Sequence, residues 1–155
     1  MIIPSLTITS EDDRPINFIE TIWHYLSPFS ANQIDIWGES FATVEHAYHW
    51  ARYLPGPERD AVKSAKSPVE CLHLSHLYKK EPGVLKSDFD KDAIMEELFR
   101  AKLHQHPHVA DVLKLSGTRC LLKEISTDSY WGVGADGGGE NKMGKLWMKI
   151  RSELL

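Results

Sequence analysis

Glycines gathered late in the chain restrict the fold more than any other feature of the sequence. Six of the ten glycines lie in the segment 132–144. Gly132, Gly134 and Gly137 match the G-x-G-x-x-G pattern, which in a Rossmann fold links a strand to the helix of a βαβ unit. Too few residues follow the match for such a unit, and the next predicted helix does not begin at its last glycine. The segment therefore predicts a loop and argues against a dinucleotide-binding fold.

Residues of ligand-binding types surround these glycines. One interpretation is a flexible surface loop, because glycine-rich loops are common. Against it, glycine lets a backbone approach a ligand closely, and an indole ring offers a flat face for a base or a ribose. Long loops that hold a shape of their own are more often functional. The polar and aromatic members that make this segment a candidate binding loop are Asp128, Tyr130, Trp131, Asp136 and Asn141.

Most of the remaining chain has helical spacing, with apolar residues recurring three and four positions apart behind capping residues. Ser67 is a predicted N-cap, and Glu70 is expected to bond back to the Ser67 amide. The predicted helices run from Thr43 to about Arg52, from Ser67 to about Tyr78, from Ser87 or Asp88 to about His104, over a short stretch after Pro107, and from about Lys145 onward, the last burying Leu146, Ile150 and Leu154.

Strand signals are few and short. Gln33–Phe41 has the pattern of a hairpin with its turn at Gly38 and Glu39, and Cys120–Ile125 is a candidate strand. We therefore predict an α+β fold that is mainly α-helical with a few short strands. The length of 155 residues fits a single domain over 1–155.

Composition excludes several classes of protein. Hydrophobic residues make up 42% and charged residues 26%, as in a soluble globular protein. No apolar run is long enough to cross a bilayer, and the N-terminus lacks the pattern of a secretory signal, so we expect a cytoplasmic protein without a membrane partner. A net charge of −4 argues against binding nucleic acid by charge alone, but it allows a local cationic pocket for a phosphate.

The predicted helix after Thr43 carries a possible catalytic face. Glu45, His49 and Arg52 fall on one side of it, with Tyr48 at the border of the apolar stripe. A carboxylate, an imidazole and a guanidinium together could perform acid–base work beside a phosphate. The alternative is a solvated helix face on which the glutamate is favoured by the helix dipole.

No metal or redox cofactor is expected. The eight histidines include pairs at i, i+3 spacing, but the H-E-x-x-H motif is absent and neither cysteine is placed to help form a zinc site. Cys71 and Cys120 are isolated in the sequence, so we predict two reduced, buried thiols and no disulfide framework.

Four segments together resemble the NADAR family over residues 17–155, in the family's order and spacing. The most specific is the glycine segment, which is similar to the family's Trp-Gly-x-Gly-x-Asp-Gly-x-Gly-x-Asn-x-x-Gly loop. The early motif is weaker. The segments are Leu26–Ser30, Thr43–Tyr48, Asp128–Gly144 and Met148–Arg151.

The resemblance implies an α+β fold and hydrolysis of N-glycosidic bonds. Family members are known to act on phosphorylated ribosylamino-pyrimidine intermediates of riboflavin synthesis, or on ADP-ribose attached to the guanine amino group of nucleic acid. Some act as antitoxins to DNA-modifying ADP-ribosyltransferases. The implied partners are thus an ADP-ribose or phosphoribosyl ligand, ADP-ribosylated DNA or RNA, and a cognate ADP-ribosyltransferase toxin.

Cleavage of a ribosyl–nitrogen bond needs a carboxylate near the anomeric carbon and an acid near the departing nitrogen, and glycosidases often use two carboxyl groups for these tasks. Glu45 and Asp128 are the predicted catalytic pair, with Glu45 activating water or holding the ribose and Asp128 near the leaving base, or with these roles reversed. The predicted substrate-binding residues are Trp131 as a stacking surface, Gly132 and Gly134 beside the phosphates, Arg52 as the phosphate partner, and Asn141, Asp136, Tyr48 and Phe89.

The sequence departs from the family pattern at several positions. Pro28 stands where asparagine is common, and the pair His49 and Trp50 replaces a Gln-Ala-like pair. Phe89 stands where small bacterial members carry a tryptophan proposed to line the pocket, which favours an ADP-ribosyl substrate over the riboflavin type. Two non-catalytic interpretations stay open, an ADP-ribose-binding module and an adaptor whose glycine loop contacts a protein.

Overall fold

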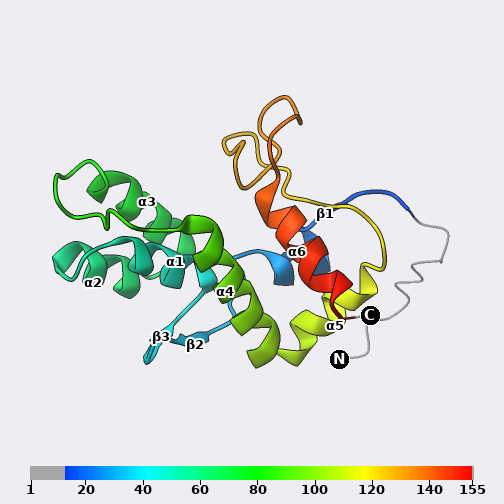
Figure 1. Cartoon of the computed structure of the whole chain (residues 1–155), viewed down its shortest axis with the longest axis horizontal. Helices are drawn as coiled ribbons and strands as arrows, with labels where there is room; N and C mark the ends of the chain where they lie inside the picture. Colours follow the sequence, from blue (N-terminus) through cyan, green and yellow to red (C-terminus); the bar gives the residue numbers. More distant parts are fainter. Residues whose placement is uncertain (1–12, 155) are drawn as a thin grey trace. The chain divides into compact units, whose positions relative to one another are not determined.

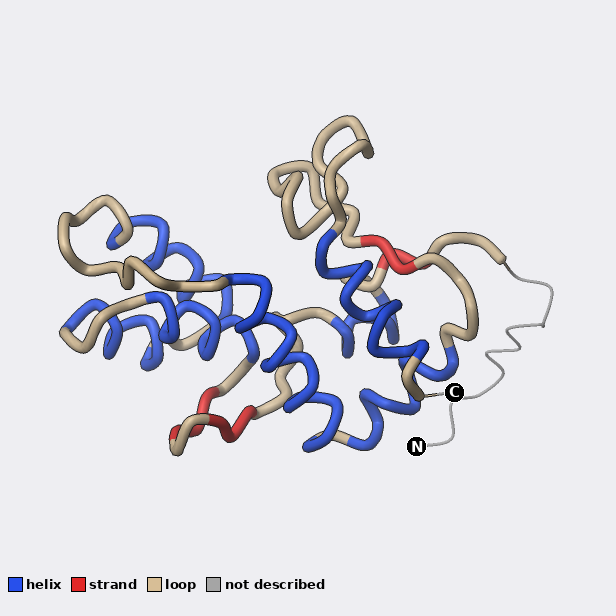
Figure 2. The backbone as a smooth tube through the Cα atoms, viewed as in Figure 1, coloured by secondary structure: helices blue, strands red, loops and turns tan. Residues whose placement is uncertain are grey.

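The computed structural model describes residues 13–154, and helices are the main secondary structure in them (Figure 2). These residues gather in two compact units. One unit is formed by residues 27–109 and the other by residues 13–26 together with 110–154. The predicted α+β fold with few short strands is confirmed. The single-domain interpretation stays a prediction.

The unit of residues 27–109 is built around one helix. Helix α1 packs against α2, α3 and α4, and it also contacts strand β3 (Figure 1). Strands β2 and β3 form an antiparallel hairpin in which Ile34 pairs with Phe41. The elements of this unit are β2 (Ile34–Ile36), β3 (Glu39–Phe41), α1 (Val44–Arg52), α2 (Pro57–Ser64), α3 (Pro68–Tyr78) and α4 (Lys91–Gln105).

Two helix starts follow their predicted caps. The Thr43 hydroxyl accepts the His46 amide, and the Ser67 hydroxyl accepts the Glu70 amide at 3.0 Å, so α1 and α3 begin as predicted. The return bond from Glu70 differs from the prediction. Its carboxylate accepts the amide of Lys66 at 2.6 Å instead of the Ser67 amide.

Other boundaries differ from the prediction. Helix α4 begins at Lys91 because Asp90, and not Ser87 or Asp88, accepts the amide of Ala93. Helix α2 was not predicted. Its N-cap is Gly56, which has no side chain to bond the first turn, so the capping signal is missing, although Pro57 stands at the first helical position.

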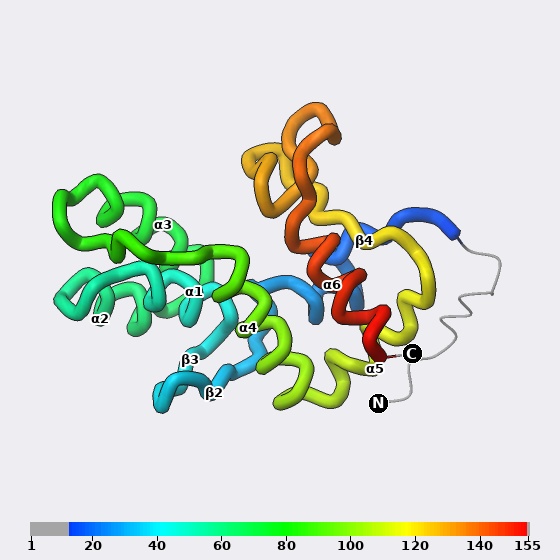
Figure 3. Tube along the Cα trace, in the orientation of Figure 1, coloured from blue at the N-terminus to red at the C-terminus, as the bar shows by residue number. Residues whose placement is uncertain are grey.

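The unit of residues 13–26 and 110–154 holds the two ends of the described chain, blue and red in Figure 3. Its strands pair in parallel, and the fully buried Trp147 donates its indole N–H to the Leu26 carbonyl at 2.8 Å. Leu154 is exposed, so its predicted burial is wrong. The elements are β1 (Ile16–Asn17), η1 (Thr21–Leu26), the later part of α5 (Pro107–Leu115), β4 (Leu121–Leu122) and α6 (Lys142–Ser152).

Strand β4 is shorter than the predicted Cys120–Ile125. The amide of Lys123 donates to the side-chain oxygen of Asn141 at 3.0 Å, so a side chain from outside the strand takes the place of a further strand partner. The same asparagine precedes α6, which begins three residues before the predicted Lys145.

Lys102, on α4, is a fully buried lysine and gives a testable pH dependence. Its ammonium group donates to the Ser27 carbonyl at 2.7 Å and to the Ser30 hydroxyl, and burial lowers its pKa to about 7. Between pH 7 and the unfolded value of 10.5, the unfolded chain holds a proton that the folded protein has lost. The free energy of unfolding contributed by Lys102 therefore rises with pH across this window, by on the order of 4 kcal/mol.

Urea unfolding of wild type and Lys102→Met at several pH values between 7 and 10 checks this prediction. The methionine variant is expected to lose the rise, because its side chain does not titrate. Parallel pH curves for the two proteins would contradict the assignment.

Candidate active site

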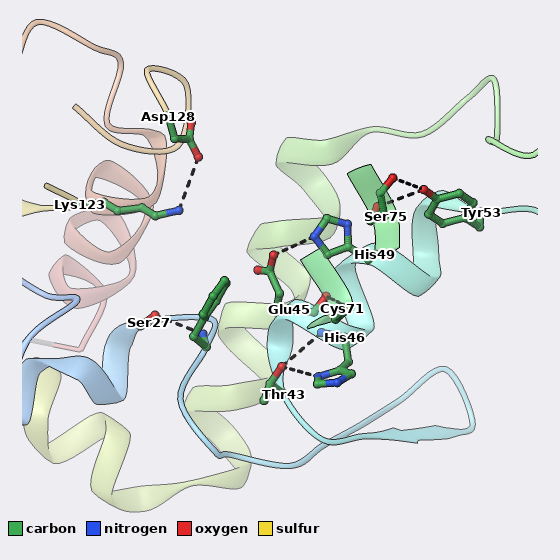
Figure 4. Close-up of polar contacts among 11 residues, drawn as sticks. Ser27, Thr43, Glu45, His46, His49, Tyr53, Cys71, Ser75, Lys123 and Asp128 are labelled. Carbon is green, nitrogen blue, oxygen red and sulfur yellow. Dashed lines mark hydrogen bonds and ion pairs between the residues drawn. The ribbon is translucent and has the colours of Figure 1, made fainter. Parts of the chain in front are cut away.

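Glu45 and His49 form a buried pair on α1. The Glu45 Oε1 atom lies 2.7 Å from the His49 Nε2 atom, and the two residues are only 6% and 3% exposed (Figure 4). The predicted placement of both residues on one helix face is confirmed. The alternative of a solvated face is wrong for them, since both lie in the interior.

The local sequence explains why this pair is buried. The Thr43 cap fixes the start of α1, and Val44, Ala47 and Ala51 anchor one side of it in the core. Residues four apart in a helix are neighbours, so Glu45 and His49 meet without help from another element. The Tyr48 ring then packs edge-on against the imidazole, with ring centroids 5.2 Å apart.

Helix α3 supplies the polar groups beside this pair. The Cys71 Sγ atom lies 3.9 Å from the Glu45 carbonyl oxygen. Burial, followed by the charges of Glu45 and Glu70, raises the pKa of the Cys71 thiol, so it stays protonated and is a poor nucleophile. Desolvation, followed by the positive charge of Lys79, lowers the pKa of His76 on the same helix. The Cys71 thiol is therefore not a candidate nucleophile, and the Glu45 carboxylate is the candidate catalytic group of this site.

Two predicted substrate-binding residues, Phe89 and Arg52, contact a third, Tyr48, beside the pair. The Phe89 ring lies edge-on to the Tyr48 ring, with centroids 5.5 Å apart. The Arg52 guanidinium lies 5.9 Å from the centre of the Tyr48 ring. Residues 27–109 thus bring together Glu45, Tyr48, Arg52 and Phe89, all predicted site residues.

A cavity of about 430 Å³ lies against Phe89, within the usual volume range of small-molecule sites. Sequence reasoning missed its two tryptophans, Trp37 and Trp50, whose rings stack 6.0 Å apart. The hairpin turn lies at Trp37 and Gly38, one residue before the predicted Gly38 and Glu39, and Trp37 has a φ of 57° there. A tryptophan beside the turn glycine, where asparagine, aspartate or glycine is usual, was the available signal in the sequence. The lining residues are Trp37, Trp50, Ala51, Lys86, Asp88, Phe89, Asp90, Ala93 and Ile94.

The glycine loop belongs to the other unit and is folded on itself. A Cβ atom on Gly132 would lie 2.8 Å from the Lys123 carbonyl oxygen, and one on Gly139 would lie 2.7 Å from Val133. These glycines are required by close approach within the loop, whatever they do for a ligand. Main-chain bonds that close the loop run from the amides of Gly134, Gly139, Glu140, Asn141, Lys142 and Met143 to the carbonyls of Asp128, Val133, Ser129, Gly132, Tyr130 and Trp131, respectively.

Asp128 holds the start of this loop. Its Oδ1 atom accepts the amides of Tyr130 at 3.0 Å and Trp131 at 2.9 Å, and its Oδ2 atom lies 3.5 Å from the Lys123 ammonium (Figure 4). These contacts orient the Trp131 backbone. They also surround the carboxylate with groups that suit an anion.

Asn141 holds the end of the loop in a left-handed conformation, with a φ of 49°. Its amide group donates to the Leu121 carbonyl at 2.9 Å and accepts the Lys123 amide, so both of its polar atoms are bonded to the backbone at β4. Asp136 accepts the Gly138 amide at 2.9 Å in an exposed turn. This gives Asn141 a structural role, and the substrate contacts predicted for both residues stay predictions.

The predicted residues thus fall in both units. Glu45, Tyr48, Arg52 and Phe89 lie in residues 27–109, whereas Asp128 and the rest of the loop lie in residues 110–154. Joint action of Glu45 and Asp128 remains a prediction. Neither cysteine forms a disulfide, and the predicted burial holds for Cys71 but is wrong for Cys120, which is exposed.

Two further findings concern residues 13–154 only. They contain no group of three or more histidine, cysteine, aspartate or glutamate residues arranged to hold a metal ion. None of their helices is both long enough and apolar enough to span a membrane.

Comparison of the sequence and the fold with those of known proteins identifies the family. The model of the NADAR domain family matches residues 13–155, nearly the whole chain. The chain belongs to the NADAR domain family. The NMR structure of Escherichia coli YbiA has a TM-score of 0.76 at 26% identity, and the match covers 92% of this chain and 85% of that one. The mainly helical arrangement is therefore the NADAR fold.

Curated NADAR relatives carry two kinds of name. The N-glycosidase YbiA of Escherichia coli is 29% identical over 146 residues, 92% of this chain and 89% of the relative. An N-glycosidase of Nostoc punctiforme is 32% identical over 133 residues, 83% of each chain. The chloroplastic riboflavin biosynthesis protein PYRR of Zea mays is 32% identical over 140 residues, which is 83% of this chain but 22% of that longer protein.

Proposed function

We propose that this protein is an N-glycosidase that hydrolyses a ribose–nitrogen bond in a nucleotide-like substrate. The observation that carries the proposal is the buried Glu45 carboxylate held by His49. A carboxylate is expensive to bury, and one retained beside aromatic residues and an arginine has a chemical use that explains it. The N-glycosidase names of the relatives support the same reaction class.

The chemistry follows from charge. As the bond to nitrogen breaks, positive charge develops on the anomeric carbon, and a fixed carboxylate stabilises it more than a mobile one does. Glu45 is the group for this task and for drawing a proton from the attacking water. Arg52 would bind a phosphate of the substrate, with Tyr48 and Phe89 as apolar walls.

Asp128 remains the proposed second carboxylate. Its two amide donors and Lys123 suit an anion, so we assign it to accepting a hydrogen bond from the leaving base. The departing nitrogen keeps the electron pair of the broken bond and takes up the proton that Glu45 draws from the attacking water. Trp131, whose backbone this carboxylate orients, would provide the stacking surface for the base or the ribose.

The preferred substrate is ADP-ribose attached to the guanine amino group of nucleic acid. The support is Phe89, a phenyl ring where small bacterial members of the family carry an indole. It lies one ring away from the Glu45 and His49 pair, through Tyr48. In this role the protein would reverse the action of a DNA-modifying ADP-ribosyltransferase toxin, working in the cytoplasm.

A second candidate is hydrolysis of phosphorylated ribosylamino-pyrimidines. It is favoured by the names of two relatives, the Zea mays protein and a riboflavin biosynthesis protein of Vibrio vulnificus that is 26% identical over 144 residues. The proposed reaction class is the same, and the leaving base is smaller.

Side-by-side assays decide between these substrates. Wild type is incubated with an ADP-ribosylated guanine oligonucleotide and, separately, with a ribosylamino-pyrimidine phosphate, and release of ADP-ribose or ribose phosphate is followed. We expect faster release from the oligonucleotide. Faster turnover of the pyrimidine would favour the second candidate, and binding of ADP-ribose without turnover of either would make the protein a binding module and overturn the proposal.

A further inference from the structure

His49 contains a buried atom whose presence needs an explanation. The Nδ1 atom is enclosed and makes no hydrogen bond to any residue in the described range 13–154. A buried polar atom left in this way costs about 1–3 kcal/mol and is uncommon in folded proteins. A side chain such as leucine would fill the site without that cost. The benefit of histidine here must therefore come from its other nitrogen.

The hydrogen bond at Nε2 defines the state of the ring. An ionised carboxylate only accepts hydrogen bonds, so the 2.7 Å contact to Glu45 Oε1 requires the proton on Nε2. A second proton on Nδ1 would bury a charged N–H without a partner, on a helix that already carries Arg52. The geometry therefore favours a neutral imidazole with its proton on Nε2.

Glu45 depends on this single bond. Within residues 13–154, no side chain other than His49 donates a hydrogen bond to its carboxylate. A glutamate side chain has several rotatable bonds, and holding it in one conformation costs up to about 2 kcal/mol of entropy. His49 offsets that cost because its own ring is held edge-on by Tyr48 at 5.2 Å.

We propose that His49 is the positioning residue of the Glu45 carboxylate. The neutral imidazole occupies Oε1 and fixes the side chain, so that Oε2 is the oxygen presented to the substrate. His49 exchanges no proton with the substrate, because its Nδ1 atom is enclosed. This inference rests on the proposed N-glycosidase function and adds the residue that makes its carboxylate rigid.

Two substitutions at one position test the proposal. His49→Gln keeps a side-chain N–H that can reach Glu45, whereas His49→Leu fills the space without a donor. We expect kcat of the leucine variant to fall by about 10- to 100-fold, with a much smaller change in KM, since a misplaced catalytic group costs about that much. The glutamine variant is expected to recover most of the rate. His73→Leu, at an exposed position on α3, is the matched control and should retain wild-type kcat.

A double variant separates positioning from a general effect on the fold. In the Glu45→Gln background no carboxylate remains to be positioned, so His49→Leu should lower the residual rate no further. A purely structural histidine would instead lower the rate by the same factor in both backgrounds, and the glutamine and leucine variants would then follow their melting temperatures.

Each outcome has a separate meaning. Wild-type turnover with an undiminished His49→Leu rate overturns the role of His49 and leaves the proposed function standing. Equal losses in the glutamine and leucine variants at equal melting temperature, or an unchanged loss in the Glu45→Gln background, also overturn it. A folded wild-type protein that cleaves neither substrate overturns the proposed function, and the role of His49 with it.

Discussion

Glu45→Gln is expected to lower kcat/KM by about 10³-fold, the usual effect of removing a group that stabilises charge in the transition state. The amide is neutral, so it cannot stabilise the positive charge that develops on the ribose or draw a proton from water. The amide oxygen can still accept the His49 Nε2–H, so the fold around α1 should be kept. Steady-state rates with the better of the two substrates measure the loss.

Glu81→Gln is the control for this prediction. Glu81 is exposed just beyond α3, and the same chemical change there should leave kcat/KM at the wild-type value. A Glu45→Gln protein that folds normally and keeps more than about a tenth of the wild-type rate would show that Glu45 is not catalytic. A tenfold loss of rate corresponds to only about 1.4 kcal/mol of activation free energy.

Gly144→Ala is expected to be the most destabilising of the single substitutions considered, by about 3–5 kcal/mol. A Cβ atom at this position in α6 would lie 2.1 Å from the Leu121 carbonyl oxygen and 2.4 Å from the Asn141 side-chain nitrogen. The helix would have to move away from β4, and the hydrogen bonds of Asn141 to Leu121 and Lys123 would break. Alanine favours a helix by about 1 kcal/mol over glycine, which offsets only part of the cost.

Urea or thermal unfolding of Gly144→Ala and Gly138→Ala provides the comparison. At Gly138 an added Cβ would be at an ordinary distance of 3.4 Å from Asp136, so the same chemical change should alter stability by less than about 1 kcal/mol. Equal stabilities for the two variants would show that α6 and β4 do not pack as closely as described.

Features encoded by neighbouring residues were predictable from the sequence. The Thr43 and Ser67 caps need only a hydroxyl and an amide three positions later, and the Glu45 and His49 pair needs only one helical turn. Each of these contacts forms within a single helix, so spacing alone predicts it. The family motif then added the reaction class.

Features that depend on distant residues were not predictable. The stacking of Trp37 on Trp50 joins a hairpin turn to a helix, and the end of β4 depends on Asn141, which follows it by many residues. The burial of Lys102 beneath Ser27 and Ser30 likewise shows no local pattern. In each case tertiary packing determines which residues meet, and the spacing of apolar residues along the sequence carries no information about it.

The shape of the glycine loop depends little on the side chains at its tip. Its form is set by main-chain bonds that any residue can make, and by glycines whose position in the packed interior admits no side chain. The exposed tip, residues 135–138, contributes little to that frame. Apart from Gly137, whose φ of 76° favours glycine, substitutions at the tip can therefore accumulate with little loss of stability. If the loop binds substrate as proposed, its tip is where substrate range can diverge between relatives during evolution while the fold is inherited unchanged.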